Sequence, residues 1–452
     1  MTPARLAAVR VLLALDRQQT TLAAEIERTR SMTTDERDRA LVLELTAGTL
    51  RWRNELDAMI AACSRRAVSD LGAQVRAVLR LGAYQLRHLD RIPSHAVVHE
   101  SVELIRGLGQ SRATGFVNAV LRSITRRGAQ MPLPRRPDAN SKREDVIRYL
   151  TTTLSHPGWL AERWLDRYGF EAAAQWCEFN NRAAEITVRV LRPADIATTL
   201  KQLRNAGVEA TPAPWVRDAF RIPPGTWGLV PTDLRARLLI QDEASQIVAL
   251  TAGARPGERV LDACAAPGGK TLVMAEAMGG QGQLIAGDYR AARMRLLAAA
   301  LKRAGARASL VQIDAGKPLP FGQAFDRVLL DAPCSGLGIV RRDPDIKWTR
   351  SAADQVDFAR RQGEMLRAAA DAIRPGGTLV YATCSSEPEE NEGVVDALVA
   401  SRDDMSLVVA DPGPAVLRGA ELVDDRGMLR TLPFRHGLDA FFCAVLVRRQ
   451  AA

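Results

Sequence analysis

The stretch Leu261-Asp-Ala-Cys-Ala-Ala-Pro-Gly-Gly-Lys-Thr271 decides the fold of the C-terminal half of the chain. It continues a short apolar run typical of a strand, and its paired glycines predict a tight turn into a helix. Glycine lets a ligand approach the backbone closely, and the free N–H groups of a helix start attract an anionic group such as a carboxylate. A tight turn without any ligand is the alternative that the glycines alone leave open.

From Arg235 onward, apolar runs of strand length alternate with segments of helix length, which predicts a doubly wound α/β sheet. In such a sheet, ligands bind beyond the carboxyl ends of the strands. Aspartates and cysteines occur at these ends, so a functional site is expected there. The predicted strands are Arg259–Cys264, Gln283–Asp288, Ala308–Asp314, Phe325–Asp331, Gly377–Cys384 and Phe441–Val447.

The spacing of residues around the glycine turn indicates an adenosine-containing cofactor. Asp288 comes 20 residues after Gly268, a separation at which a carboxylate can accept hydrogen bonds from ribose hydroxyls. A Walker A loop is excluded because Cys264 stands where its first glycine is needed, and the dinucleotide fingerprint is excluded because Pro267 precedes adjacent glycines. S-adenosylmethionine, which has a carboxylate, a ribose and an adenine but no phosphate, suits the arrangement better.

The cysteines point to a reaction class. Six are spread along the chain without a Cys-x-x-Cys pair, so neither a disulfide scaffold nor a zinc site is expected. Carbon 5 of cytosine is a weak nucleophile, and an enzyme that methylates it first adds a thiolate at carbon 6. Cys334 and Cys384 both lie at strand ends, with Asp331 placed to hydrogen-bond the pyrimidine and stabilise the adduct. Chemistry alone does not choose between the two cysteines.

The first third of the chain is helical in pattern and strongly basic. Residues 1–137 hold 22 arginines, no lysine and 13 acidic residues, a net charge of +9 out of +10 for the whole chain. Concentrated arginine predicts RNA or DNA as the partner. His95 and His99 are four residues apart, a spacing that favours an ordinary helix face over a metal pair.

Three domains are predicted: a helical domain over 1–137, a small α/β module over 142–235 and the doubly wound domain over 236–452. In the middle module we expect a helix around Trp159–Tyr168, a strand Ile186–Leu191 and a helix Asp195–Ala206. No apolar run reaches the ~18 residues of a membrane helix. The N-terminus lacks the features of a signal peptide. We therefore expect a cytoplasmic monomer without membrane or metal.

Several motifs resemble the RNA cytosine-5 methyltransferase family: Asp262-Ala-Cys-Ala-Ala-Pro-Gly-Gly-Lys-Thr271, Asp331-Ala-Pro-Cys-Ser-Gly336 and Thr383-Cys-Ser385. N-terminal stretches also resemble the NusB-like domain joined to this catalytic domain in the bacterial enzymes that modify small-subunit ribosomal RNA. These stretches are Gly48-Thr-Leu-Arg51, Ile92-Pro-Ser-His-Ala-Val-Val-His-Glu100 and Phe116-Val-Asn-Ala-Val-Leu-Arg122.

The resemblance implies Cys384 as the nucleophile and Cys334 as the residue that helps release the product. The chemistry above adds Asp331 as the third catalytic residue. It also implies that Arg341–Trp348 lies near the substrate, and it leaves Ala440 in Leu438-Asp-Ala-Phe-Phe442 where the family usually has glycine. The implied partner is small-subunit ribosomal RNA, free or in a partial particle. The implied S-adenosylmethionine site is Cys264, Ala265, Ala266, Pro267, Gly268, Gly269, Lys270, Asp288, Asp314 and Asp331.

Two other functions compete with this interpretation. One is an RNA-binding antitermination or assembly factor that has lost catalysis, against which the intact Cys384, Cys334 and Asp331 argue. The other is a DNA cytosine methyltransferase, in which the Pro-Cys cysteine, Cys334, would be the nucleophile. The Thr-Cys-Ser motif and the NusB-like stretches favour RNA.

Overall fold

The computed structural model describes residues 2–30, 32–33, 35–138, 140–191, 196–223 and 225–450. The chain folds as two compact units. One comprises Met1–Ala183 together with Val340–Ala352, and the other comprises Ala184–Ile339 together with Ala353–Ala452. A segment from the second half of the sequence is therefore part of the first unit. The division into domains 1–137, 142–235 and 236–452 stays a prediction.

The first unit is helical, as its apolar spacing predicts. Leucine, valine and isoleucine recur on one face of each helix and form one core, which includes Leu45, Leu56, Val78 and Leu121. Side-chain caps start two of the helices, because Thr21 and Asp35 accept hydrogen bonds from N–H groups of the first turn. The helices of this part are α1 Pro3–Leu15, α2 Leu22–Thr29, α3 Glu36–Arg51, α4 Arg53–Ser64, α5 Ala73–His88, α6 Ser94–Gly107 and α7 Thr114–Arg127.

Residues 131–138 form no helix or strand. Beyond them lie α8 (Arg143–Arg148) and α9 (Gly158–Asn181). Trp164 and Trp176 of α9 are fully buried and stack with ring centroids 4.5 Å apart. These tryptophans therefore pack in the core of this part of the chain.

The second unit begins with a small antiparallel sheet of order β2-β3-β1-β4, formed by β1 Ile186–Val190, β2 Thr211–Pro212, β3 Ala219–Ile222 and β4 Leu238–Ile240. Helix α10 runs from Ile196 to Asn205. The predicted start of that helix at Asp195 lies outside the described residues. Helix α11 spans Thr232–Arg235.

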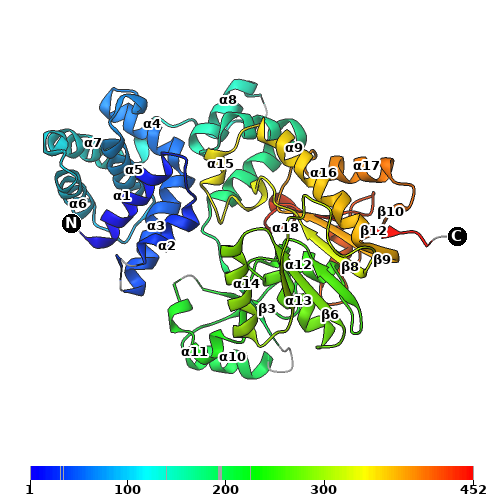
Figure 1. Ribbon diagram of the computed structural model, residues 1–452. Coiled ribbons are helices and arrows are strands. Elements are labelled where there is room, and N and C mark those ends of the chain that lie inside the picture. The colour runs from blue at the N-terminus through cyan, green and yellow to red at the C-terminus, as the bar shows by residue number, and fades with distance from the viewer. Residues whose placement is uncertain are drawn as a thin grey trace. The chain divides into compact units, whose positions relative to one another are not determined.

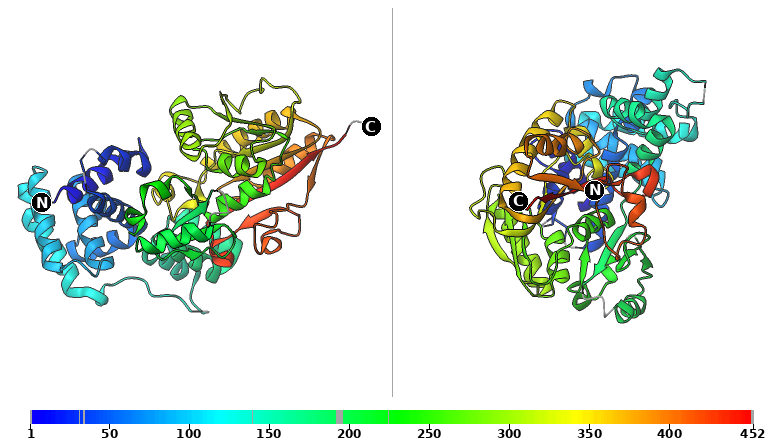
Figure 2. Two further views of the ribbon diagram at one scale, coloured as in Figure 1. Left: turned by 90° about the horizontal axis from the view of Figure 1, so that it is seen from below. Right: turned by 90° about the vertical axis from the view of Figure 1, so that its right-hand side faces the viewer.

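The larger sheet has the order β10-β12-β9-β8-β5-β6-β7, with β11 beside β12 (Figure 1). Its strands from β9 to β7 are parallel, whereas β12 is antiparallel to its neighbours. Figure 2 shows β12 as the red strand that leads to the C-terminus. The strands are β5 Arg259–Asp262, β6 Gln283–Asp288, β7 Ser309–Gln312, β8 Phe325–Asp331, β9 Ile373–Thr383, β10 Met405–Val408, β11 Leu429–Thr431 and β12 Phe441–Arg448.

Alternate side chains of the central strands pack in two hydrophobic cores, one on each face of the sheet. Val260, Leu329 and Val380 pack with α12 and α13, whereas their neighbours Leu261, Leu330 and Tyr381 pack with α16 and α17. This is the helix-sheet-helix layering of a doubly wound fold. The helices of this part are α12 Glu243–Thr251, α13 Gly269–Met278, α14 Ala291–Ala304, α16 Asp354–Ala372, α17 Glu392–Ser401 and α18 Pro433–His436.

Candidate active site

The strand register brings the predicted site residues to one edge of the large sheet. Strands β5, β6 and β8 end at Asp262, Asp288 and Asp331. Asp331 pairs with Ala382 of β9, two residues before Cys384. Asp314 follows β7 by two residues. Strands β6 and β7 follow on one side of β5, whereas β8 and β9 lie on its other side, so the strand order reverses between β5 and β8. Open α/β sheets bind their ligands at such a switch point.

The glycine turn between β5 and α13 is compact for a steric reason. Gly268 has a φ of +111°, and a Cβ there would lie 2.9 Å from Leu297 Cδ1 of α14. A larger residue would therefore be strained by the positive φ, and the Leu297 side chain would have to shift. Ala265 and Ala266 pack with Leu297 in the same apolar cluster. The turn thus leaves the first N–H groups of α13 at the ligand edge of the sheet.

Two buried carboxylates beside this turn each carry an oxygen without a hydrogen-bond partner among the described residues. Thr271 donates to Asp262 Oδ2 at 2.7 Å, whereas Asp262 Oδ1 has no partner. Burial raises the pKa of Asp262 to about 7, against the opposing hydrogen bond from Thr271. Asp288 Oδ1 accepts from the Arg290 N–H at 3.1 Å, and its Oδ2 accepts no hydrogen bond.

The remaining predicted cofactor residues differ in their surroundings. Burial raises the pKa of the Cys264 thiol, so this cysteine stays protonated and is no nucleophile. Asp314 Oδ1 accepts from the Gly316 N–H at 3.0 Å. Asp262 was not among the residues predicted for the site, although it opens the motif at the end of β5, which was the signal available.

Lys270 turns toward the cysteines. Its Nζ donates to Asp331 Oδ2 at 2.6 Å. Burial alone would lower the pKa of Lys270, but the charge of Asp331 and this hydrogen bond raise it above its usual value. Lys270 therefore stays protonated, with its ammonium group beside the Asp331 side chain at the end of β8.

Cys334 and Cys384 lie in contact, with their sulfur atoms 3.1 Å apart. The hydrogen bond with Cys384, followed by burial, raises the pKa of Cys334 well above its usual value. Cys334 thus holds its proton near neutral pH, directly beside the second thiol. Two adjacent sulfurs, one of them kept protonated, can divide nucleophilic attack and proton handling between them.

Ala440 fits where glycine is usual because its backbone does not need a positive φ. The Ala440 N–H donates to Gly338 O at 2.9 Å, and the Gly338 N–H donates to Cys384 O at 2.9 Å. A Cβ on Gly338 would lie 1.9 Å from Ala440 O. At this contact Gly338 is the position that has to be glycine.

In the first unit, part of the segment Val340–Ala352 is held by buried contacts, whereas Thr349, Ser351 and Ala352 are exposed. Lys347 is fully buried and donates to Arg51 O at 2.8 Å and Ser155 O at 2.7 Å. Trp348 Nε1 donates to Leu50 O at 2.7 Å. Lys347 and Trp348 therefore serve the packing of this unit.

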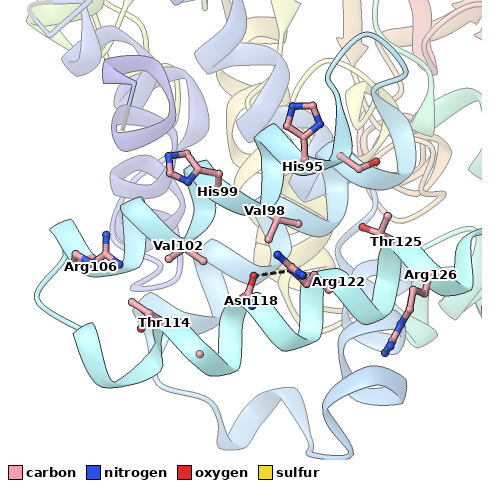
Figure 3. A pocket seen from close by; sticks show the side chains of 12 residues that line it. His95, Val98, His99, Val102, Arg106, Thr114, Asn118, Arg122, Thr125 and Arg126 are labelled. Atoms are coloured by element: carbon pink, nitrogen blue, oxygen red, sulfur yellow. Dashed lines mark hydrogen bonds between the residues drawn. The ribbon is translucent and has the colours of Figure 1, made fainter.

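A basic groove of about 790 Å³ lies between α6 and α7 in the first unit (Figure 3). Val98 and Val102 contribute apolar surface to it, and Asn118 accepts a hydrogen bond from Arg122 at 3.2 Å. His95 and His99 both line this groove, each exposed. The cations of the groove are Arg106, Arg122 and Arg126.

Within the described residues, no group of three or more His, Cys, Asp or Glu side chains is arranged to hold a metal ion. Across the same residues, no helix is both long and apolar enough to cross a membrane.

Three family descriptions match the chain. The description "16S rRNA methyltransferase RsmB/F" matches residues 249–447, the NusB family matches residues 2–126, and the ferredoxin-like domain of RsmF/B-like methyltransferases matches residues 156–225. The small α/β module predicted within 142–235 thus corresponds to a ferredoxin-like domain.

Two curated relatives cover nearly the whole chain. The ribosomal RNA small subunit methyltransferase B of Pseudomonas putida is 35% identical over 99% of both chains. The probable ribosomal RNA small subunit methyltransferase B of Bacillus subtilis is 35% identical over 90% of both chains. A crystal structure of NSun6 from Pyrococcus horikoshii with SFG shares the fold, with a TM-score of 0.56 and 20% identity over 65% of this chain and 99% of that one.

The alignments with these two relatives cover at least 90% of the chain, which also contains the matched methyltransferase and NusB regions. The chain belongs to the RsmB/F family of 16S rRNA methyltransferases.

Proposed function

We propose that this protein methylates carbon 5 of a cytosine in small-subunit ribosomal RNA, through a covalent adduct on Cys384. The observation that carries the proposal is the contact between Cys334 and Cys384, beside the Lys270–Asp331 pair. Methylation at a ring nitrogen or an oxygen needs no thiol nucleophile, whereas methylation at carbon 5 of a pyrimidine does. The names of the family and of its relatives supply ribosomal RNA as the substrate.

S-adenosylmethionine is the proposed cofactor, and the residues present fit it. Asp262 Oδ1 and Asp288 Oδ2, which accept no hydrogen bond among the described residues, are acceptors for the amino and ribose hydroxyl donors of such a molecule, although Asp288 Oδ2 also lies 3.6 Å from Arg293 Nε. The N–H groups at the start of α13 suit its carboxylate. The NSun6 structure that shares the fold was determined with SFG, an analogue of S-adenosylmethionine. When bound, the cofactor supplies an electrophilic methyl group.

We assign the roles of this chain's own residues from the family resemblance, and their positions in the structure are compatible with it. The sulfur of Cys384 forms a bond to carbon 6, which gives carbon 5 the electron density that it needs to accept a methyl group. Asp331 offers Oδ1 to the pyrimidine ring while its Oδ2 is held by Lys270. After methylation, a base takes the proton from carbon 5, the electrons of that C–H bond restore the double bond between carbons 5 and 6, and the bond between carbon 6 and sulfur breaks with its electron pair on the Cys384 sulfur. Cys334 holds a proton beside Cys384 and assists this release by donating it to the departing Cys384 sulfur.

We place the RNA-binding function of the first unit on its basic surface, including the groove between α6 and α7. Arg122 and Arg126 line that groove and form no ion pair with a carboxylate among the described residues. Such cations are free to contact phosphates. The target cytosine has to be unstacked, because neither face of its ring is accessible in a helix. We expect the protein to act in the cytoplasm.

Bisulfite sequencing of small-subunit ribosomal RNA tests the proposal directly. Cells that lack the gene are complemented with the wild-type chain or with Cys384→Ala. We expect one or more protected cytosines with the wild-type chain and none with the variant. An identical bisulfite pattern in both strains would contradict cytosine-5 methylation, and protection that needs Cys334 but not Cys384 would reverse the roles of the two cysteines.

A further inference from the structure

Glu390 is a fully buried carboxylate that holds the loops of both cysteines. Its Oε2 accepts the Ser335 N–H at 2.8 Å, and its Oε1 accepts the Ser385 hydroxyl at 2.7 Å. The Ser335 hydroxyl also donates to Oε1. Ser335 follows Cys334 and Ser385 follows Cys384, so a single side chain bonds the residue next to each sulfur.

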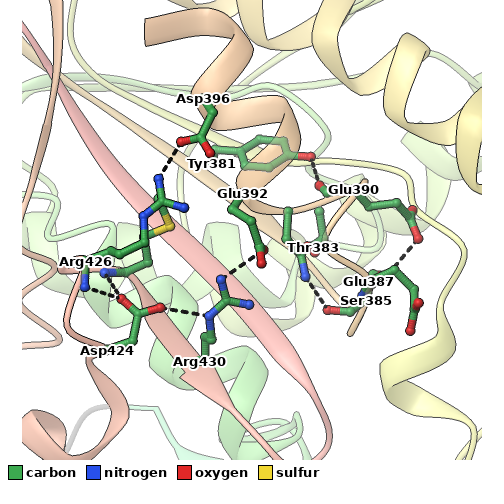
Figure 4. A network of polar contacts seen from close by, with 12 residues as sticks. Tyr381, Thr383, Ser385, Glu387, Glu390, Glu392, Asp396, Asp424, Arg426 and Arg430 are labelled. Atoms are coloured by element: carbon green, nitrogen blue, oxygen red, sulfur yellow. Dashed lines mark hydrogen bonds and ion pairs between the residues drawn. The ribbon is translucent and has the colours of Figure 1, made fainter. Parts of the chain in front are cut away.

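The surroundings hold Glu390 in this place. Gln362 of α16 donates to its Oε2 at 2.9 Å and to Pro333 O at 3.0 Å. The Tyr381 hydroxyl of β9 donates to the Glu390 backbone carbonyl at 2.6 Å, and Asn391 Nδ2 donates to Ser385 O at 3.0 Å. Figure 4 shows Tyr381, Ser385 and Glu390 in this network. The carboxylate is therefore anchored from a strand, a helix and its own loop.

Hydrogen bonds alone compensate the burial of the Glu390 carboxylate. Glu390 forms no ion pair with a cation among the described residues, and a buried carboxylate without a counter-charge is destabilising unless hydrogen bonds compensate. Every group around its two oxygens acts as a donor in the structure, as an acceptor-only carboxylate requires. The carboxylate thus satisfies donors on two loops at once.

We propose that Glu390 is a positioning residue that sets the distance between the sulfurs of Cys334 and Cys384. It bonds both serines and so holds the loop after β8 against the loop after β9. The inference deepens the proposed function, because it assumes that both cysteines serve one reaction. Glu390 itself is buried beneath the serines and touches no reacting atom.

Two substitutions separate positioning from charge. Glu390→Ala removes all four hydrogen bonds. Glu390→Gln keeps the shape, since a glutamine oxygen can accept from Ser335 N–H and Gln362 while its NH2 donates to the two serine hydroxyls. A misplacement of about 1 Å can cost ~100-fold in rate. We expect kcat to fall about 100-fold in Glu390→Ala and within about 3-fold in Glu390→Gln, with the cofactor Kd unchanged in both.

The spacing of the sulfurs is measured without any RNA by oxidation with diamide. Two thiols lose two protons and two electrons, which reduce the diazene to the hydrazine, and the Cys334–Cys384 disulfide is identified by peptide mass spectrometry. We expect the disulfide to form at least 10-fold more slowly in Glu390→Ala than in wild type or Glu390→Gln. The pKa of Cys334 is raised by its hydrogen bond with Cys384, by burial and, to a smaller extent, by the negative charge of Glu390, so loss of that charge alone would make the Cys334 thiol more reactive. Slower oxidation therefore reports on distance.

Glu392→Gln is the matched control, because Glu392 lies two residues away and pairs with Arg430 at 2.9 Å. We expect wild-type disulfide formation and kcat in this variant. If Glu390→Ala does not fold, Ser385→Ala is used in its place in both assays. This variant removes one of the donors to the Glu390 carboxylate. Wild-type oxidation in folded Glu390→Ala, or equal losses in the Gln and Ala variants, would overturn the inference. Slow oxidation with an unchanged kcat would instead contradict the proposed function, in which both cysteines serve the same methylation reaction.

Discussion

Lys270 Nζ and Asp331 Oδ2 lie 2.6 Å apart, although 61 residues separate them in the chain. The pair joins the first turn of α13, which follows the glycine turn, to the end of β8, which leads to Cys334. The proposed cofactor site and the proposed catalytic cysteines are thus linked by one ion pair. Lys270 was predicted only as a residue of the cofactor site, and the structure adds this second contact.

Loss of the Lys270 ammonium is expected to reduce the rate more than cofactor binding. Lys270→Met leaves Asp331 without its cation, and a hydrogen bond to a charged group is worth about 1.5–3 kcal/mol. We therefore expect single-turnover methyl transfer to slow by roughly 10- to 150-fold. Lys302→Met, at an exposed site on α14, serves as the control. Equal rates in the two variants would argue against a role for the pair in the reaction.

Asp288 is expected to hold the cofactor ribose, because its buried Oδ2 accepts no hydrogen bond among the described residues. Asp288→Ala should weaken S-adenosylmethionine binding by roughly 10- to 150-fold, which corresponds to about 1.5–3 kcal/mol. Titration calorimetry on the full chain measures this change. Asp371→Ala, at a side chain 71% exposed, is the control. Unchanged affinity in Asp288→Ala would remove this residue from the site.

The groove between α6 and α7 is expected to contribute to RNA affinity by neutralising phosphates. The double variant Arg122→Gln/Arg126→Gln should lower the slope of log affinity against log salt by about 0.7–0.9 for each phosphate that is no longer neutralised. The charge-matched control is Arg10→Gln/Arg17→Gln, at two exposed arginines outside the groove. Salt titrations of RNA binding compare the two. If both double variants change the slope equally, the groove has no special part in binding.

His156 should make the first unit sensitive to mild acid. Burial, followed by the charge of Lys347, lowers its pKa well below the usual 6.5. Below about pH 6.5 the unfolded chain therefore binds a proton that the folded chain does not. Stability falls as the pH falls, by up to about 1.4 kcal/mol per pH unit. His156→Gln removes this proton uptake.

Calorimetric unfolding between pH 7.5 and 5.5 measures the effect. The wild-type melting temperature should fall more steeply than that of His156→Gln, whereas His99→Gln, at an exposed histidine, should follow the wild type. The same pH dependence in all three proteins would show that His156 titrates alike in the folded and unfolded chains.

Strands buried on both faces were predictable because apolar runs with clear ends specify them. The predicted bounds of β6 and β8 match those observed, and β9 starts four residues earlier than predicted, at Ile373. The short strands β10 and β11 were missed, since three or four residues beside β12 carry too little pattern to be distinguished from a loop.

The site was predictable to the extent that its residues stand at strand ends. Contacts between distant segments were not. Ser335 and Glu390 are 55 residues apart and nothing local links them. Lys347 belongs to a polar stretch that resembles a substrate contact, and only the packing of Val340–Ala352 in the first unit shows that it is buried. Tertiary burial of a charged side chain leaves no periodic signal.

The most direct test of the account is covalent trapping with the two cysteine variants. Purified Cys334→Ala and Cys384→Ala proteins are incubated with unmodified small-subunit ribosomal RNA and S-adenosylmethionine, then separated by denaturing electrophoresis. Cys334→Ala should accumulate a protein–RNA adduct because attack by Cys384 proceeds while release is slowed. Cys384→Ala and the double variant should trap nothing and transfer no methyl group. An adduct with Cys384→Ala but not with Cys334→Ala, or methylation by Cys384→Ala, would contradict the assignment of Cys384 as the nucleophile.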